Sequence, residues 1–263
     1  MNSSIKKTQA QRFIRTLDVL RELVSRDFKL RYKRSLLGIA WSLLVPIAQL
    51  VVLYQVFHKI LPLNVPHYTT FLFTGILPWT WLQTSLLAGT GAIVDNRELV
   101  KQVGFPVGIL PAITVVSQLI HFLLALPILF AFLWLDGYRL TFALLALPLV
   151  ILIQFILIVS LTYIVATLQV KFRDIQYLLG IALFLVFYLT PVFYDAKNLP
   201  SDIRAIFRLN PMAALLDAYR AIFMDGHLPA GRPLITLSVA SLAILSVGYT
   251  VFMRAREQFV EEL

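Results

Sequence analysis

Residues 140–170 read LTFALLALPLVILIQFILIVSLTYIVATLQV, a run of 31 residues without Asp, Glu, Lys or Arg. A membrane-spanning helix needs about 20 mostly apolar residues, and a charge at the bilayer centre costs roughly 2.5–3.5 kcal/mol on insertion scales. A transmembrane β-strand would alternate over about 10 residues, and the part from Leu147 to Leu161 does not alternate. The stretch therefore predicts a transmembrane helix.

Further charge-free runs, each 20 to 35 residues long, lie on both sides of this one. They cover 35–58, 60–94, 102–135, 175–194 and 233–253. The composition agrees, because 59% of the residues are hydrophobic and only 14% are charged, against about 25% charged in a soluble domain. The sequence predicts an all-α integral membrane protein with six transmembrane helices, and it excludes most soluble enzyme folds.

The basic residues gather on one side of the predicted spans. The chain has 23 Lys and Arg against 14 Asp and Glu, a net charge of +9, and ten of the basic residues lie in segment 1–34. Cytoplasmic segments carry such an excess, so both termini are predicted in the cytoplasm and the charge needs no nucleic-acid partner. The chain divides into a cytoplasmic segment 1–34 without a cleavable signal peptide, a transmembrane domain 35–253 and a cytoplasmic tail 254–263.

The N-terminal segment carries an amphipathic pattern. Thr8 and Gln11 form a weak capping box at its start. The apolar positions with helical spacing are Phe13, Leu17, Leu20, Val24 and Phe28. A helix with this pattern at a basic membrane surface is typical of an in-plane interfacial helix; the alternative is a simple topology anchor.

The segment between the second and third predicted spans is short and charged. Its charged and polar residues are Asp95, Asn96, Arg97, Glu98 and Lys101. Asp95 can cap a helix over 95–103, and Gly104 and Pro106 end it. The pattern predicts a cytoplasmic helix of two turns on which a partner protein could act; the alternative is a solvated loop.

The segment 195–232 predicts two short helices on the outer face. Asn210 and Pro211 supply an N-cap and an N1 proline for the second one, whose apolar stripe runs from Met212 through Tyr219 to Phe223, with Asp217 and Arg220 off the stripe. The first helix carries Arg204 and Arg208, which we expect at a wet rim. Such helices could dip back into the membrane where protein or a water-filled cavity covers them.

The sequence offers no catalytic or metal-binding constellation. It has no cysteine, no HExxH and no GxxxxGK[ST] phosphate loop, and His121 is the one ionisable residue well inside a predicted span. Ion-coupled transporters usually place such groups at mid-membrane. We therefore expect no enzyme activity, no ATP hydrolysis and no cofactor in this chain, and we interpret His121 as a packing residue.

Aromatic residues form two clusters in the predicted spans. They are Phe71, Phe73, Trp79 and Trp81 in the second span, and Phe187, Tyr188, Phe193 and Tyr194 at the end of the fifth. One interpretation is an interfacial aromatic belt. The other is a neutral channel wall on which sugar rings stack.

Several motifs together resemble the ABC-2 type permeases that export polysaccharides. They are LRYKRSLLGIAW at 30–41, NRELVKQVGFPVGILP at 96–111, RDI at 173–175, TPVFY at 190–194 and LNPM at 209–212. The resemblance implies a homodimer with two ABC ATPase subunits that bind ATP and Mg. It also implies an interface helix at 8–26, a coupling helix at 95–103 and periplasmic gate helices at 201–224 over a channel between the protomers.

The resemblance also implies a polysaccharide carried on undecaprenyl pyrophosphate as the substrate. Arg31, Lys33 and Arg34, with Trp41, lie where its pyrophosphate would arrive from the cytoplasm, although these basic residues could simply set topology. The sequence thus favours the permease subunit of an ATP-driven exporter of O-antigen in the bacterial inner membrane. The alternatives are export of capsule, teichoic acid or another lipid or drug and, in a different class, an intramembrane transferase acting on lipid-linked sugars.

Overall fold

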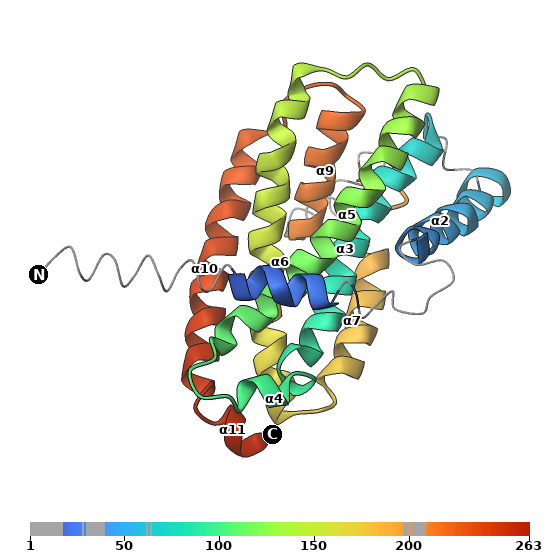
Figure 1. Cartoon of the computed structure of the whole chain (residues 1–263). Coiled ribbons are helices and arrows are strands. Elements are labelled where there is room, and N and C mark those ends of the chain that lie inside the picture. Colours follow the sequence, from blue (N-terminus) through green and yellow to red (C-terminus); the bar gives the residue numbers. More distant parts are fainter. Residues whose placement is uncertain are drawn as a thin grey trace, which may run out of the picture.

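The computed structural model of the chain is a bundle of long helices (Figure 1). It describes residues 18–27, 29, 40–61, 63, 65–196, 200 and 209–263, and within these ranges it contains helices, turns and no strand. The predicted substrate-binding residues Arg31, Lys33 and Arg34, the rim residues Arg204 and Arg208, and most of the first predicted gate helix lie outside the described residues.

Four long helices form the centre of the bundle: α3 (Tyr68–Val94), α5 (Leu110–Leu135), α6 (Leu147–Lys171) and α10 (Gly231–Ala255). The most extensive contacts are those of α10 with α6 and of α3 with both α5 and α6. Small residues let these helices approach closely, as is usual in membranes. A Cβ on Gly248 would lie 2.9 Å from the carbonyl oxygen of Ser160, and a Cβ on Gly89 would overlap the side chain of Thr162.

Two helices lie at one side of this centre. The helix α2 (Ala40–Tyr54) continues into a π-helical turn, η1 (Gln55–Ile60), and packs on α3. The helix α7 (Ile175–Tyr188) contacts α3 and α6, but its buried side chains are those of Leu183 and Phe187. Most of the apolar surface of α7 is therefore left to lipid or to another chain.

The helix α7 ends earlier than the charge-free run 175–194 predicts. It has 14 residues, about 21 Å at 1.5 Å per residue, which is less than the ~30 Å of the hydrocarbon core. Its last residues are followed by a buried turn at Thr190, Pro191 and Val192. The predicted fifth span is therefore helical over Ile175–Tyr188 only, and this helix alone is shorter than a membrane crossing.

The second predicted helix of segment 195–232 is present as α9 (Pro211–Phe223). It lies within the bundle and not over its end, in the half of the molecule that α7 does not reach (Figure 1). It packs against α3, α6 and α10. The second, fourth and sixth predicted spans therefore line its place.

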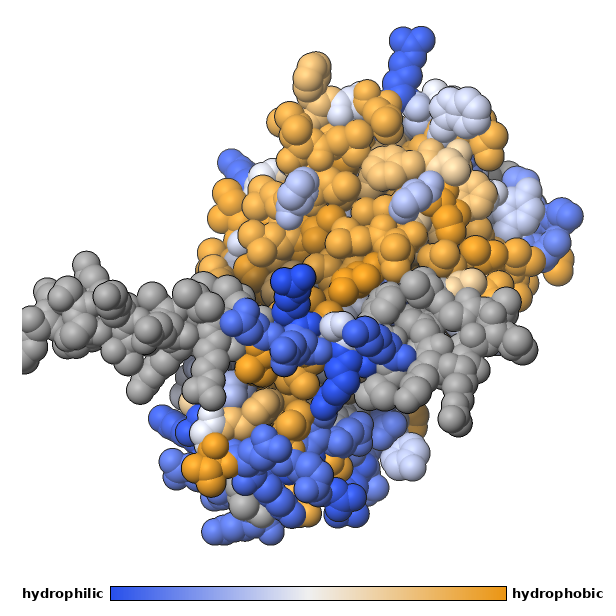
Figure 2. All heavy atoms as spheres, in the orientation of Figure 1, coloured by the Kyte–Doolittle hydropathy of each residue, from blue (hydrophilic) through white to orange (hydrophobic). Residues whose placement is uncertain are grey.

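Short elements close the two ends of the bundle. The α4 end carries α4 (Arg97–Val100), the 3₁₀ turn η2 (Val107–Ile109) and α11 (Phe259–Glu262), and the α9 end carries the 3₁₀ turn η3 (Phe142–Ala146). Helical residues 18–27 run across the direction of the bundle (Figure 1), with Val24 buried. Figure 2 shows a broad hydrophobic surface over most of the bundle and hydrophilic side chains gathered near the α4 end.

The described residues contain 4 helices that are long and apolar enough to cross a membrane. They are Leu43–Ile60, Val107–Leu135, Phe142–Lys171 and Gly231–Ala255. The helix α3 has 27 residues and is also long enough, whereas α7 is a shorter apolar helix. The chain is thus an all-helical, multi-pass membrane protein.

Candidate functional site

The N-terminus of α9 is tied to the end of α7. The side chain of Asn210 accepts a hydrogen bond of 2.9 Å from the backbone N–H of Met212, as predicted for an N-cap. Its amide nitrogen donates to Oγ1 of Thr190 at 2.9 Å, and that hydroxyl donates to the carbonyl of Val186. The motifs TPVFY and LNPM, 20 residues apart, therefore meet through Asn210 and Thr190.

Arg220 holds the same turn from the other end of α9. Its Nη2 donates a hydrogen bond of 2.9 Å to the carbonyl oxygen of Val192, and its guanidinium lies 3.7 Å from the ring centroid of Phe71. Only 8% of the residue is exposed. A buried cation is costly unless it is paired or hydrogen-bonded, so this contact joins α9, α3 and the turn after α7 strongly.

Gly75 makes room for this arrangement on α3. A Cβ at this position would lie 2.7 Å from the carbonyl oxygen of Val192 and 3.2 Å from Nη2 of Arg220. Any other residue would push these two atoms away. The prediction that Arg220 lies off the apolar stripe is therefore corrected: Arg220 is buried, whereas Asp217 is exposed.

A second polar contact lies deeper between α9, α6 and α3. The hydroxyl of Tyr219 donates to Oε1 of Gln154 at 2.8 Å, and Nε2 of Gln154 donates to the carbonyl oxygen of Pro78 at 2.8 Å. Tyr219 and Gln154 are fully buried. Because water is excluded there, these groups depend on one another for hydrogen bonds. The two bonds therefore fix the position of α9 relative to α6 and α3.

The second-span aromatic residues are buried within the protomer. Phe71, Phe73, Trp79 and Trp81 are at most 5% exposed. Trp81 stacks on Phe122 at 5.1 Å, and Trp79 contacts Phe187 at 5.6 Å. The structure places these rings in the core because α3 is covered by helices on several sides, so they present no surface to a channel between two protomers.

The fifth-span aromatic residues are divided between the core and the surface. Phe187 and Phe193 are buried, and the carbonyl of Phe193 accepts a hydrogen bond of 2.8 Å from the hydroxyl of Tyr68. Tyr188 is 49% exposed, Tyr194 is partly exposed, and the hydroxyl of Tyr194 donates to the carbonyl of Tyr188 at 3.1 Å. Among the eight predicted channel residues, these two tyrosines present ring surface to the outside.

A polar cluster closes the α9 end. His67 approaches Asp136 at 3.4 Å, and Thr70 donates a hydrogen bond to the same carboxylate. Burial, and next the carboxylates of Asp136 and Asp225, raise the pKa of Tyr138 above its ordinary value. These contacts join the start of α3 to the end of α5.

The predicted coupling segment is a single helical turn. The helix α4 runs from Arg97 to Val100, Asp95 closes α3 instead of capping α4, and Asn96 occupies the N-cap without a capping hydrogen bond from its side chain. Asn96 instead donates to the carbonyl of Ala92 and accepts from Arg26 at 3.0 Å. The expected two-turn helix over 95–103 is therefore too long.

The α4 segment exposes its charges and anchors on one apolar side chain. Arg97, Glu98 and Lys101 are exposed, whereas Val100 is buried. Gly104, with φ of +82°, lies in a turn after the helix, whereas α4 itself already ends at Val100. Val103 is fully exposed, so this turn presents both charged and apolar groups to a partner.

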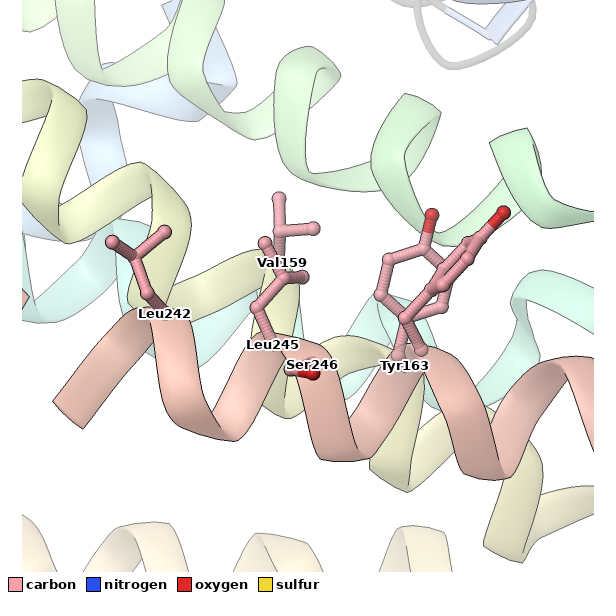
Figure 3. Close-up of a pocket in the computed structure, with 6 residues that line it drawn as sticks. Val159, Tyr163, Leu242, Leu245 and Ser246 are labelled. Atoms are coloured by element: carbon pink, nitrogen blue, oxygen red, sulfur yellow. The ribbon is translucent and has the colours of Figure 1, made fainter. Parts of the chain in front are cut away.

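Trp41 and a surface groove complete the candidate positions. Trp41, predicted near the substrate, is 54% exposed on α2. A groove of about 390 Å³ lies between α6 and α10 (Figure 3). It is lined by Val159, Tyr163, Leu242, Leu245, Ser246 and Tyr249. The described residues contain no group of three or more His, Cys, Asp or Glu that could hold a metal ion.

Membrane-length helices, a polar-anchored helix within the bundle and an exposed charged turn at the opposite end define a multi-pass membrane protein. The chain belongs to the ABC-2 type transporter family, because the family profile matches residues 18–224. The family resemblance seen in the sequence motifs is thereby confirmed.

Curated relatives match over nearly their whole lengths. The chain is 36% identical to an O-antigen export system permease protein RfbA of Myxococcus xanthus, over 93% of this chain and 95% of the relative. It is 30% identical to an RfbA of Klebsiella pneumoniae, over 94% and 95%. It is 24% identical to the polysialic acid transport protein KpsM of Escherichia coli, over 90% and 92%.

Two buried polar contacts were missed by sequence reasoning. Gln154 and Tyr68 carry no charge, and a search for ionisable groups inside the spans passes over them. Gln154 is, however, a polar residue within the apolar run ILIQFILI at 151–158. A buried amide must find hydrogen-bond partners, so this position could have been found as a helix–helix contact.

Proposed function

We propose that this chain is the membrane permease of an ATP-driven exporter of lipid-linked polysaccharide, with O-antigen as the favoured substrate. The observation that carries the proposal is the similarity to an O-antigen export permease over 93% of this chain and 95% of the relative. A match of this extent includes the helices of the bundle and the segments at both of its ends. The carrier of the polymer would be undecaprenyl pyrophosphate.

The proposed assembly is a homodimer with two ABC ATPase subunits, which bind ATP and Mg. Each ATPase would dock on one α4 segment, where exposed Arg97, Glu98 and Lys101 surround the fully exposed Val103. A mixed charged and apolar surface suits a protein partner that must stay attached while it changes shape. Helical residues 18–27 support this site, because Arg26 donates a hydrogen bond to Asn96.

The proposed topology has six membrane crossings and places both termini in the cytoplasm of a bacterium, with the chain in the inner membrane. The excess of basic residues in segment 1–34 supports this orientation. The α4 end is then cytoplasmic and the α9 end periplasmic. The fifth crossing would combine α7 from the cytoplasmic side with the turn at Thr190 and with α9 from the periplasmic side.

The proposed pathway for the polymer lies between two protomers. The side of α2 and α7 supports this, because α7 leaves Tyr177, Ile181 and Phe184 more than half exposed. Tyr188 and Tyr194 would offer sugar-stacking rings there. The α9 helix, as the gate element, would move with the turn that Arg220 and Asn210 hold.

Opening of the gate is tested by cysteine labelling in this naturally cysteine-free chain. Ala213 on α9 is buried, so Ala213→Cys should react slowly with a membrane-impermeant thiol reagent at rest and faster when the ATPase is trapped with ATP. Ala230→Cys, at an exposed position of the same end, is the matched control and should react equally in both states. Equal reactivity of Ala213→Cys in both states would remove the gating role.

The proposed function as a whole is tested in a host that lacks its own O-antigen permease and retains the rest of the pathway. Expression of this chain should restore the polymer at the cell surface, and the tagged chain purified in mild detergent should retain an ABC ATPase. Absence of both results would contradict the proposal. Chemical analysis of the surface material of the restored host then identifies the transported polymer.

Export of a capsular polymer is the second candidate. The similarity to the polysialic acid transport protein KpsM supports it, with 24% identity against 36% for the O-antigen relative. Expression of this chain in a host that lacks its capsule permease distinguishes capsule export from O-antigen export. If the chain restores capsule and does not restore O-antigen, capsule export becomes the favoured function.

A further inference from the structure

The last turn of the chain is anchored beside the coupling segment. The helix α11 (Phe259–Glu262) packs on both α4 and α6. Phe259 is only 2% exposed, whereas Glu257, Gln258 and Glu261 around it are exposed. Phe259 is thus the buried anchor of this segment, and Leu263 packs beside the core as a partly buried side chain.

The ring of Phe259 continues a row of aromatic contacts that crosses two long helices. Its centroid lies 5.3 Å from that of Phe252 on α10, and Phe252 lies 5.1 Å from Tyr163 on α6. Tyr163 also meets Tyr249 of α10 edge to face at 5.5 Å. We call Tyr163, Tyr249, Phe252 and Phe259 the aromatic joint; Figure 3 shows Tyr163 at the end of the groove between α6 and α10.

The aromatic joint also contacts η2, the 3₁₀ turn on the segment that joins α4 to α5. The hydroxyl of Tyr163 donates a hydrogen bond of 2.6 Å to the carbonyl oxygen of Gly108 in η2. A Cβ on Gly108 would lie 3.9 Å from Tyr249 and 4.0 Å from Phe252. The joint therefore touches η2 through Gly108 and α4 through the packing of α11 on it.

A one-turn helix such as α4 has little rigidity of its own, because helix formation is cooperative and short helices are marginal alone. Neighbouring packed groups must therefore hold α4 in shape when a partner pushes on it. The covalent route from α4 leads to α3 and α5. The contacts of the aromatic joint instead lead to α6 and α10, the pair with the most extensive helix contact in the bundle.

The geometry points to a positioning role for the aromatic joint and the C-terminal residues 257–263: they transmit movement of α4 to the α6–α10 pair. This inference rests on the proposed function, in which an ATPase acts on α4. Packed rings cannot slide past one another without repacking, and close-packed interiors transmit strain. Movement at α4 would thus reach the helices that hold α9, since α9 packs on α6 and α10.

The test compares Phe259→Ala and Tyr163→Phe with controls at exposed positions. Phe142→Ala removes a 90% exposed ring at the opposite end, and Thr250→Val removes an exposed hydroxyl and its hydrogen bond of 2.6 Å on α10. In the purified complex with its ATPase, the joint variants should keep ATP hydrolysis and lose about fivefold in polymer exported per ATP, the low end of typical coupling energies. Phe259→Leu, which keeps apolar volume, should recover most of the loss.

Two outcomes would overturn the inference. One is export per ATP unchanged in both joint variants. The other is a proportional fall of hydrolysis and export together with loss of the ATPase, which would make α11 a docking surface only. If Phe259→Ala does not accumulate in the membrane, export per ATP of Tyr163→Phe alone decides the test. This variant should fold, because it keeps the aromatic ring and loses only one hydrogen bond.

A readout independent of transport separates this inference from the proposed function. A spin label on Val103→Cys, at a fully exposed position, should become more mobile when Phe259→Ala is added, and it should not change with Phe142→Ala. Equal mobility in both backgrounds contradicts the joint. Failure of the unmodified chain to export any polysaccharide, with the mobility change present, contradicts the proposed function and leaves the mechanical link standing.

Discussion

The two ends of the bundle use arginine in opposite ways. At the α9 end, Arg220 is 8% exposed and its guanidinium is held by the carbonyl of Val192 and the ring of Phe71. At the α4 end, Arg97 is exposed beside Glu98 and Lys101. The first arginine is part of the interior of the fold, and the second is part of a surface.

The two ends therefore differ in what an arginine contributes: at the α9 end it stabilises the fold, and at the α4 end it is available to a partner. A buried cation has a narrow choice of partners, so at the α9 end the loss of one contact of Arg220 should cost stability. Exposed charges at the α4 end are solvated in either case, so they can exchange water for a partner at little cost in stability. Substitutions at the two ends should therefore affect stability and export differently.

The largest effect is expected for Arg220→Ala. It leaves a cavity and an unpaired buried carbonyl at Val192, which together cost about 3 kcal/mol. The unfolding temperature of the detergent-solubilised protein should fall by roughly 6–10 °C, measured by a thermal fluorescence scan. Arg232→Ala, which removes an exposed arginine at the start of α10, is the control; an equal shift in both variants would contradict the holding role of Arg220.

The next effect concerns the α4 end and should appear in export alone. Replacing Arg97 and Glu98 together by Ala should lower export by about tenfold, which corresponds to a typical coupling energy. The unfolding temperature should stay within about 1–2 °C of that of the unmodified protein, as for other surface positions. Export is measured by surface polymer per cell. A variant that exports normally and retains the ATPase would show that α4 is not the docking site.

A smaller effect is expected for Asn210→Ala. It removes the N-cap of α9 and the link to Thr190, and loss of such a cap costs about 1 kcal/mol. The unfolding temperature should fall by roughly 2–4 °C. Asn210→Asp keeps the cap acceptor and loses the donor to Thr190, so its unfolding temperature should lie between those of the unmodified protein and Asn210→Ala. Equal unfolding temperatures of the two variants would mean that the cap contributes nothing to stability.

The smallest effect is expected for Arg31→Gln. Nine other basic residues remain in 1–34, so topology should be kept, whereas stimulation of ATPase activity by lipid-linked substrate should weaken by about threefold if a bidentate phosphate contact is lost. Lys33→Gln and Arg34→Gln are measured beside it. Unchanged stimulation in all three variants would favour a role in topology alone.

Sequence reasoning predicted the helical class, the family and the element types at both ends. It identified the N-cap Asn210, the turn at Gly104 and the helix α9 because these depend on local rules of capping, turn conformation and periodicity. It also predicted that residues 95–103 would form a short charged helix. The length of that helix was overestimated, because a helix of one or two turns is held by its packing and not by its propensity.

Other features were decided by the tertiary structure alone. The charge-free run 175–194 satisfies the hydropathy rule throughout, but α7 stops at Tyr188, and α9 lies within the bundle in the half that α7 does not reach. The aromatic residues of α3 have the composition of a belt or of a channel wall, and they lie in the core because several helices cover α3. Hydropathy indicates that a segment is buried from water and does not indicate whether lipid or protein covers it.

Arg220 illustrates the limit most clearly. By sequence it is a charged residue beside an apolar stripe, on a segment long enough to lie outside the membrane. Its burial depends on Gly75, Phe71 and the carbonyl of Val192, which come from two other parts of the chain. Composition and periodicity determined that this chain is a helical membrane protein, and its motifs indicated the permease family. The partners of its polar side chains were decided by packing, because those contacts join residues far apart in sequence.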